Sequence, residues 1–593
     1  MDHPPPLAGT ARLSLPARVN RGSIPWLPYA ILVVIAACLF GIRLAAPPNL
    51  LDQDQERPAA YVLDVVKNGH WLCQTDLTGD ITSKPPVYTW LSALVTLACG
   101  RISEFSLYLP GALAALGTAW LVFGAGRKHF GTKAGFVGAV AVMLCSAGLK
   151  EFGLARTDGI FAFTVTGAAL VAFRAWNRGR GWTWFWLIAA VATLTKGPLG
   201  VILGGCGLLA CYWERKSGHS ARLEGSHALG LVLYFLVSGG WFLLAYSEVG
   251  EPLIHKMIFK ELVGHAVFHR KFYFPGMFVW HPPLFYLARA APWSLPAGYG
   301  LWRLWKHPAS AELERRFERF LFCWFLGGLF IFGMVPHQRA DLLWPLMPAA
   351  ALIGGREIAR LTRETRPALF AGAFAASVVI GTAGFAFWYF VPHGRTKVVE
   401  QTAALKRLAL QLERRGGPEF PLTHVDDPTT LQVYLDTRRP AVSVQRAARL
   451  LRGREAAFLA VNNLEMLKAA RRPGDPPLFI LLPSAADRPL SPTRIISNRP
   501  ALEDDVPTAF CFGRLYFRMY GARLVKATER EFLFAPTQRG ANVVVVNESS
   551  EPRRVSIRSA LPQGPTPRQR LLGCDQTWKV MLSSPARPGL KAR

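Results

Sequence analysis

A dense group of charged residues follows the first long apolar segment. In the order Asp52-Gln53-Asp54-Gln55-Glu56-Arg57, it combines three carboxylates with one guanidinium. A carboxylate in low-dielectric surroundings can act as a general base, and the planar guanidinium of Arg57 can bind a phosphate through two hydrogen bonds. The group predicts a site where a nucleophile meets a phosphate. A solvated loop that caps the following helix is the alternative.

Three further cations flank or interrupt apolar segments. Lys84 precedes Pro85-Pro86 and an apolar helix, where the ammonium group and the helix N-terminus both favour an anion. Arg156-Thr157-Asp158 forms a short turn between two apolar segments, and Lys196 divides one apolar stretch into two. Gly197-Pro198 explains that division but not the charge. The alternatives are a lysine that only reaches the membrane surface and a turn closed by a simple ion pair.

Histidines accompany other polar residues in two places. His265 and His269 follow Glu261, and His337 precedes Gln338-Arg339. Imidazole and carboxylate can bind a divalent cation, but this spacing matches no defined metal motif, and the nine cysteines include no CxxC pair. A divalent cation therefore stays open and the cofactor unknown, with hydrogen-bonded histidines as the alternative.

Apolar segments must position all these residues. Of the 593 residues, 51% are hydrophobic, and the mean hydropathy is positive, which is typical of a polytopic membrane protein. We expect a mainly α-helical fold with about eleven to thirteen transmembrane helices. The expected spans are 24–46, 106–124, 134–150, 159–175, 183–197, 198–213, 227–247, 282–302, 319–335, 340–355 and 368–391.

The loops between these spans predict the orientation. Lys and Arg gather in loops on the N-terminal side of the membrane, and short cytoplasmic loops collect such residues. This topology accounts for the net charge of +29 without a nucleic-acid partner. It requires that the short apolar segment 87–100 lies along the outer surface as a helix. The charged candidates then all lie at the outer face.

The composition changes after about residue 392. Pro, Arg and Asp increase, and short β-rich runs at 456–461, 478–482 and 543–546 alternate with helical patterns such as 401–415. We therefore expect a cytoplasmic tail over 1–25, a transmembrane domain over 26–391 whose first outer loop is 47–105, and a soluble α/β domain over 392–593 on the periplasmic side.

Six short motifs occur in order within residues 25–355. They are Asp54 and Arg57 with Gly69-His70-Trp71, then Lys84-Pro85-Pro86, Ala155-Arg156-Thr157-Asp158, Leu194-Thr195-Lys196-Gly197-Pro198, Pro292-Trp293-Ser294, and Gln338-Arg339 with Pro345 and Pro348. Taken together, they resemble the lipid-carrier-dependent glycosyltransferases of the GT-C fold. The similarity is to the bacterial undecaprenyl-phosphate-aminoarabinose transferases and their relatives among protein O-mannosyltransferases.

Four positions depart from the family pattern. Ser83 occupies the place of a Glu that can help to bind a metal, so metal dependence does not carry over. Gln55 replaces a Glu, and Leu342 replaces a Tyr. Gln338 replaces a Lys, so that the phosphate pocket has one cation fewer.

The resemblance implies an inverting glycosyltransferase that moves a sugar from a polyprenyl-phosphate carrier to a lipid A-like lipid, a glycan or a protein. The reaction is expected at the outer face of a bacterial inner membrane, among membrane lipids. The implied site has Asp54 and Asp158 as catalytic residues, Arg57, Lys84 and Arg339 around the donor phosphate, and Glu56, Arg156, Lys196 and His269 in support.

Two other function classes remain as alternatives. A transporter or flippase for a lipid-linked sugar would also need many spans, but such proteins commonly contain repeated halves, and the sequence shows no repeat. A membrane-anchored scaffold would leave the charged loops unexplained. The residues name neither the sugar nor the acceptor.

Overall fold

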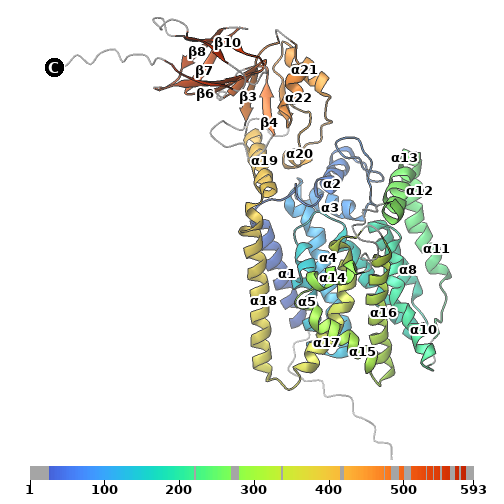
Figure 1. Ribbon diagram of the computed structural model, residues 1–593. Coiled ribbons are helices and arrows are strands. Elements are labelled where there is room, and N and C mark those ends of the chain that lie inside the picture. Colours follow the sequence, from blue (N-terminus) through green and yellow to red (C-terminus); the bar gives the residue numbers. More distant parts are fainter. Residues whose placement is uncertain are drawn as a thin grey trace, which may run out of the picture.

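A computed structural model describes thirteen stretches of the chain. The first part of the chain forms a bundle of helices, and the last part forms a β-rich domain that stands at one end of this bundle (Figure 1). We call this end the docked end. The described stretches are 26–219, 222–268, 280–335, 338–414, 420–472, 475–482, 493–499, 509–528, 531–538, 540–547, 551–560, 568–572 and 576–582.

Six helical stretches are long and apolar enough to cross a membrane, among the residues that the structure describes. The expectation of a multi-pass membrane protein is thereby confirmed. The stretches are α1 (Leu27–Ala45), α4 (Glu104–Phe130), α7 (Asp158–Arg178), the continuous helix Ala228–Val249 that contains α11 (Ala228–Tyr234) and α12 (Gly240–Val249), α16 (Glu312–Met334) and α18 (Pro367–Phe390).

The other five expected spans are also helical, but their helices are shorter or interrupted. Prolines account for two of the interruptions, because Pro198 separates two helices and Pro292 lies between two more. The helices are α5 (Thr132–Leu144), α6 (Ser146–Lys150), α8 (Trp182–Lys196), α9 (Leu199–Gly205), α10 (Leu209–Lys216), α14 (His281–Arg289), α15 (Ser294–Lys306), the 3-10 helix η5 (Ala340–Leu346) and α17 (Met347–Leu361).

The first long loop carries two helices at the docked end, α2 (Glu56–Asn68) and α3 (Val87–Cys99) (Figure 1). Helix α3 coincides with the helix expected on the outer surface. Both helices end at a glycine with a positive φ, Gly69 at 74° and Gly100 at 77°, a backbone conformation that L side chains rarely adopt. The loop therefore folds back over the bundle ends instead of extending the helices.

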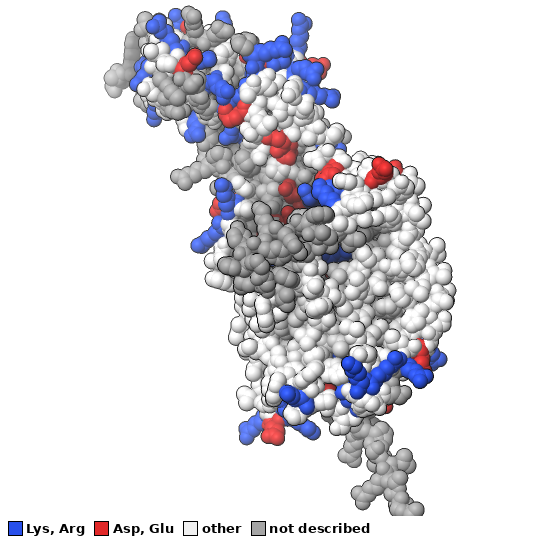
Figure 2. Space-filling view, turned by 45° about the vertical axis from the view of Figure 1, so that its right-hand side comes forward, with Lys and Arg blue, Asp and Glu red and all other residues white. Residues whose placement is uncertain are grey.

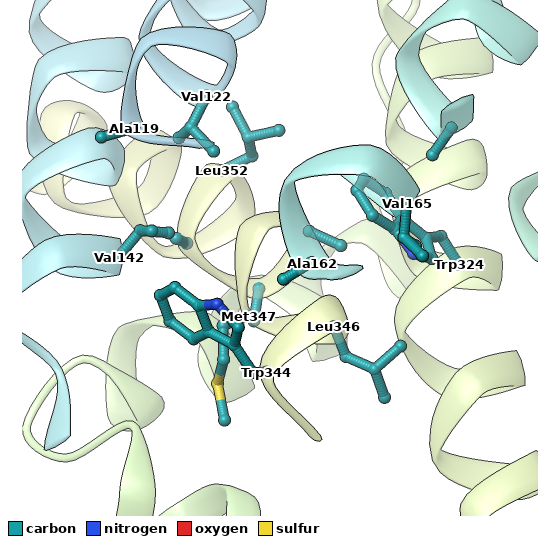
Figure 3. Close-up of a cluster of buried hydrophobic side chains, with 14 of the residues drawn as sticks. Ala119, Val122, Val142, Ala162, Val165, Trp324, Trp344, Leu346, Met347 and Leu352 are labelled. Carbon is teal, nitrogen blue, oxygen red and sulfur yellow. The ribbon is translucent and has the colours of Figure 1, made fainter. Parts of the chain in front are cut away.

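Small residues let the helices of the bundle approach closely. A Cβ atom added to Gly126 of α4 would lie 2.4 Å from the Cα atom of Gly135 in α5, so only glycine fits this crossing. Larger side chains fill the wider gaps, with Trp324 of α16 beside Val165 of α7 and Trp344 of η5 beside Met347 (Figure 3). This packing fixes the helix ends that carry the polar candidates.

One arginine is buried inside the docked end. Arg43 of α1 is only 1% exposed, and its guanidinium lies over the rings of Tyr108 in α4 and Tyr389 in α18, at 5.3 and 4.8 Å. It also donates hydrogen bonds to the carbonyl of Pro47 and the side chain of Asn49. These contacts tie three helices together and hold the start of the first loop.

The C-terminal domain is richer in β-structure than the expected α/β domain. Its helices are confined to its first part, whereas its later part consists of strands. The expected β-rich runs and the helix near 401–415 are confirmed. The helices are α19 (Lys397–Glu413), α20 (Thr429–Tyr434), α21 (Val444–Arg452) and α22 (Leu464–Ala469).

Two sheets make up this domain among the described residues. The eight-stranded sheet has the order β1-β2-β4-β3-β5-β6-β9-β12, and the four-stranded sheet has the order β11-β10-β8-β7. The strands are β1 (Leu422–His424), β2 (Phe458–Val461), β3 (Leu478–Leu482), β4 (Arg494–Ser497), β5 (Ala509–Phe512), β6 (Leu515–Tyr520), β7 (Ala522–Ala527), β8 (Glu531–Pro536), β9 (Asn542–Asn547), β10 (Arg553–Ser559), β11 (Arg568–Leu572) and β12 (Thr577–Met581).

Candidate functional site

The loop before α2 holds Asp54 in an unusual backbone conformation. Gln53 and Asp54 both have φ at 57°, in the left-handed region, which costs a non-glycine residue about 1–2 kcal/mol. The buried side chain of Gln55 supports this turn. It donates to the carbonyls of Asn49 and Asp52 and accepts a bond from the backbone N–H of Ala155 at 2.9 Å. The Asp54 carboxylate is thereby presented to solvent, with its side chain 80% exposed.

Arg339 brings a distant segment to this carboxylate. Its guanidinium lies 3.7 Å from the Asp54 carboxylate and 3.8 Å from that of Asp341. The same Asp341 carboxylate is 3.5 Å from Arg156 and 3.1 Å from the ammonium of Lys150. Three segments far apart in sequence therefore meet around Asp341. The Arg339 side chain is still 38% exposed.

Asp158 lies on the buried side of the same group. It is the first residue of α7 and pairs with Lys196, the last residue of α8. Arg156 lies 3.5 Å from its second oxygen, so that two cations and a helix N-terminus surround the carboxylate. Gly197 and Pro198 end α8 here and place the Lys196 ammonium beside Asp158. Asp158, Arg156 and Lys196 thus form one unit, which joins Asp54 and Arg339 through Asp341.

A further carboxylate lies beside this unit. Glu151 is buried, and burial together with the nearby Asp158 charge raises its pKa well above 4.5. Sequence reasoning missed Lys150 and Glu151 because Lys150 is the last residue of the expected span 134–150 and Glu151 directly follows it. The sequence did contain a signal for them: a charged residue at the end of an apolar segment, the same feature that singled out Arg156 and Lys196. We name the group formed by Asp54, Lys150, Glu151, Arg156, Asp158, Lys196, Arg339 and Asp341 the docked-end cluster.

Two expected phosphate ligands lie in a neighbouring group. The ammonium of Lys84 is 2.5 Å from the carboxylate of Glu261. Lys256 pairs with Asp80, and its hydrogen bond lowers the pKa of Asp80; the positive charge of Arg57 acts in the same direction. Arg57 itself is exposed. Among the described residues, neither Lys84 nor Arg57 forms an ion pair with the docked-end cluster.

Glu56 points away from this cluster, toward the C-terminal domain. Its carboxylate accepts bonds from the backbone N–H and the hydroxyl of Thr430, at 2.9 and 2.8 Å, and burial raises its pKa. The fully buried Asp64 in the same helix lies 3.0 Å from the guanidinium of Arg438, which also donates to Thr75. Glu56 therefore has an anchoring contact in this structure.

No group of three His, Cys, Asp or Glu side chains suited to a metal ion occurs within the described part of the chain. His269, expected as a supporting residue, lies outside the described residues, as does His337. The docked-end cluster instead combines four cations with four carboxylates. Such a site can bind an anion through its partly exposed arginine and present a carboxylate to a second reactant.

Comparisons with known proteins agree with the fold. Residues 83–241 match the family model described as Dolichyl-phosphate-mannose-protein mannosyltransferase. The structure of ArnT from Cupriavidus metallidurans bound to undecaprenyl phosphate aligns with 80% of this chain and 99% of that one, at a TM-score of 0.60 and 16% identity. The apo structure of the same protein aligns with a TM-score of 0.57 and 17% identity.

Curated relatives carry no named function. Two uncharacterized proteins of Aquifex aeolicus (strain VF5) are 28% and 26% identical over 250 and 299 residues, which are 40% and 49% of this chain. The alignments cover 52% and 56% of those proteins, so the chain spans about half the length of the curated relatives it matches. The expected resemblance to GT-C lipid-carrier-dependent glycosyltransferases is confirmed.

Proposed function

We propose that this chain, which has the ArnT-like GT-C fold, is a glycosyltransferase that takes a sugar from a polyprenyl-phosphate carrier and transfers it with inversion to an acceptor. The supporting observation is the meeting of Asp54, Arg339 and Arg156 around Asp341 at one end of the helical bundle. These residues come from three loops, yet they form one partly exposed group of charges. The fold and the family match of residues 83–241 support the same class.

The position of this group suits a lipid-linked donor. The isoprenoid tail of such a donor must stay in hydrocarbon while its phosphosugar reaches water. The docked-end cluster lies at the ends of apolar helices, where both conditions are met. Figure 2 shows the same pattern on one face of the molecule, with Lys and Arg at both ends of the helical region and a largely uncharged band between them.

In the proposed reaction, the bond between the anomeric carbon and the carrier phosphate breaks while the acceptor oxygen forms the new bond. Negative charge then grows on the departing phosphate, and fixed cations stabilise it most strongly in the transition state. Arg339 is the cation placed for this role, with Arg57 and Lys84 approaching from the first loop. Lys84 would have to exchange Glu261 for the phosphate.

Asp54 is proposed to act on the acceptor. Its carboxylate is exposed, and Gln55 holds its backbone in place, so it can take the proton of an attacking hydroxyl or orient a phosphate acceptor. Asp158 is proposed to support Asp54 from the buried side of the cluster. Its ion pairs with Lys196 and Arg156 fix the position of Arg156. A lipid A-like lipid, a glycan and a protein are all acceptors that this chemistry allows.

The proposed location is a bacterial inner membrane with the C-terminal domain in the periplasm. The basic loops at the end of the bundle opposite to the docked end support this orientation, since cytoplasmic loops collect Lys and Arg. Labelling of single introduced cysteines by an impermeant reagent in whole cells tests it. A cysteine in the C-terminal domain should react and one in loop 362–366 should not; the reverse pattern contradicts the orientation.

Transfer of a labelled sugar from a polyprenyl-phosphate donor to membrane extract tests the function. Asp54→Asn should abolish transfer without changing the yield of folded protein, because Asp54 is exposed and its one ion pair among the described residues, with Arg339, spans 3.7 Å. Glu364→Gln, an exposed carboxylate at the other end of the bundle, is the matched control and should keep full activity. Near-normal transfer by Asp54→Asn would contradict the assignment.

A further inference from the structure

A groove of about 680 Å³ lies on the C-terminal domain, away from the docked-end cluster. Its floor is one face of the large sheet. Tyr516 and Arg518 of β6 stand opposite Val546 and Val544 of β9, and Thr577 of β12 continues the row. Alternation along β6 puts Tyr516, Arg518 and Tyr520 on this face while the residues between them are buried.

The wall of the groove is built by α22 and the segment before it. The Asp426 carboxylate accepts hydrogen bonds from the backbone N–H groups of Asn462 and Asn463, both at 2.6 Å. These bonds fix two side-chain amides at the edge of the groove. The hydroxyl of Thr493 donates to the Asn462 side chain at 3.3 Å. The edge is thereby held in place by the protein itself.

The lining is positively charged and partly aromatic. Lys468, Arg494 and Arg518 face one carboxylate, Glu465. The ammonium of Lys468 is 2.9 Å from Glu465, which leaves the two arginines as the cations in excess. The guanidinium of Arg518 lies over the ring of Tyr516 at 5.7 Å, and Tyr520 is 40% exposed. Hydrogen bonds with Tyr516 and Tyr520 orient this guanidinium, which has five N–H donors in all.

We propose that this groove binds an anionic saccharide, meaning a sugar that carries a phosphate or a carboxylate. Tyrosine rings offer flat apolar surface to the C–H face of a sugar, the asparagine amides can bond its hydroxyls, and Arg494 and Arg518 can bond its anionic group. The volume lies within the range of small-molecule sites. This inference rests on the proposed function, in which the saccharide belongs to the acceptor.

The attachment of the domain supports a role in acceptor binding. Glu56 and Asp64 of α2 bond to Thr430 and Arg438, so the domain is tied to the helix that begins two residues after Asp54. A saccharide held in the groove is therefore held on the same side of the bundle as the reacting carboxylate (Figure 1). The groove would then select anionic acceptors and leave the transfer chemistry to the docked-end cluster.

Binding to the full-length protein in detergent tests the proposal. Calorimetric titration would use trigalacturonic acid and glucose 6-phosphate as anionic saccharides, with maltotriose as the neutral saccharide and inorganic phosphate as the plain anion. At least one anionic saccharide should bind at least tenfold more tightly than maltotriose and phosphate. Arg518→Gln and Arg494→Gln should each weaken this binding about tenfold. Arg523→Gln, an exposed arginine of β7, is the matched control and should leave it unchanged.

Four results would overturn the proposal: no binding of either anionic saccharide, equal binding of maltotriose, equal binding of inorganic phosphate, or unchanged binding in Arg518→Gln. The measurement is independent of turnover, because Asp54→Asn should bind the saccharide like the wild type. If the wild-type protein bound the saccharide but transferred no sugar from any donor, the result would support the groove and contradict the glycosyltransferase assignment. If the wild-type protein transferred sugar but bound no anionic saccharide, the result would support the glycosyltransferase assignment and contradict the groove.

Discussion

The two ends of the helical bundle both carry many charges, but the charges are arranged differently. At the end opposite to the docked end, Glu214, Glu318 and Glu357 are completely buried. Glu357 alone accepts contacts from Arg303, Arg356 and Arg360, at 3.4, 2.8 and 2.8 Å. Each of the three carboxylates contacts two or more donors.

The docked end is looser. Arg339 lies 3.7 and 3.8 Å from its two carboxylate partners, and its side chain is 38% exposed. Asp54 is 80% exposed and sits in a strained turn. Charges that serve only to hold helices together should be buried and closely paired, as Glu357 is. Charges that meet a ligand need free hydrogen-bonding capacity and a fixed position, which Asp54 and Arg339 have. The comparison therefore supports the proposal that the opposite end holds the helices together and that the chemistry takes place at the docked end.

The largest effect on stability is expected at the opposite end. Glu357→Ala leaves three arginines around an empty position, and removing one partner from a buried ion-pair group costs about 3–5 kcal/mol. We expect a clear fall in the thermal unfolding temperature in detergent. The transfer rate per folded molecule should stay near that of the wild type. A Glu357→Ala variant as stable as the wild type would contradict the claim that the buried charges at this end hold the helices together.

Arg339→Gln should have the reverse effect. Loss of a cation that stabilises charge in the transition state lowers the rate about 10²–10³-fold. The contacts of Arg339 are long and partly exposed, so the unfolding temperature should change little. Arg363→Gln, an exposed arginine at the opposite end, serves as the control in the same transfer assay and should be as active as the wild type. If Arg339→Gln and Arg363→Gln lost activity equally, the result would contradict the claim that only the docked end serves catalysis.

A smaller effect is expected from the contacts that hold the C-terminal domain. Arg438→Gln removes the arginine that pairs with the buried Asp64, and the resulting shift of α2 should lower the transfer rate about tenfold, because small displacements of reacting groups slow catalysis. Lys67→Gln breaks the more exposed pair with Asp436 and should have little effect. Hydrogen exchange of α2 should increase in the first variant only. Similar exchange in both would show that the buried contact does not position the helix.

The smallest effect concerns Glu151 and pH. Its pKa in the folded chain is raised above the ordinary value of 4.5, so its contribution to stability is full below that value and is lost as the pH rises through the folded pKa. Glu151→Gln removes this dependence and should be at least as stable as the wild type at pH 7. The advantage should vanish near pH 4, as measured by thermal unfolding across this range. If the stability advantage of Glu151→Gln instead grew toward low pH, the result would contradict a raised pKa of Glu151 in the folded chain.

The sequence allowed much of the fold to be predicted, because apolar segments and basic loops have a strong physical signature. The described part of every expected span forms one or more helices, and the short segment 87–100 forms α3. The break at Gly197-Pro198 was predicted, whereas the interruption at Pro292 was not, since a continuous apolar composition hides a break in the helix. The C-terminal domain was harder still, because its short strands pair in an order that local patterns do not encode.

The candidate site was predictable where charge stood out against apolar surroundings. Arg156, Asp158 and Lys196 were expected together, and they meet in the structure. Glu56 was also expected at the site, but its contact with Thr430 depends on a residue 374 positions away, which no local pattern reveals. Gln55 stood out only as a departure from a family motif, whereas its hydrogen bonds show that it supports the turn of Asp54.

The most direct test of the central claim compares wild-type protein, Asp54→Asn and Glu364→Gln in transfer of labelled sugar from synthetic polyprenyl-phosphate donors to membrane extract. The account predicts label in an extract component with wild type and Glu364→Gln, and none with Asp54→Asn. Transfer by Asp54→Asn at the wild-type rate would contradict the role of the docked end. Donor that crosses a vesicle bilayer without any transfer would identify a flippase instead.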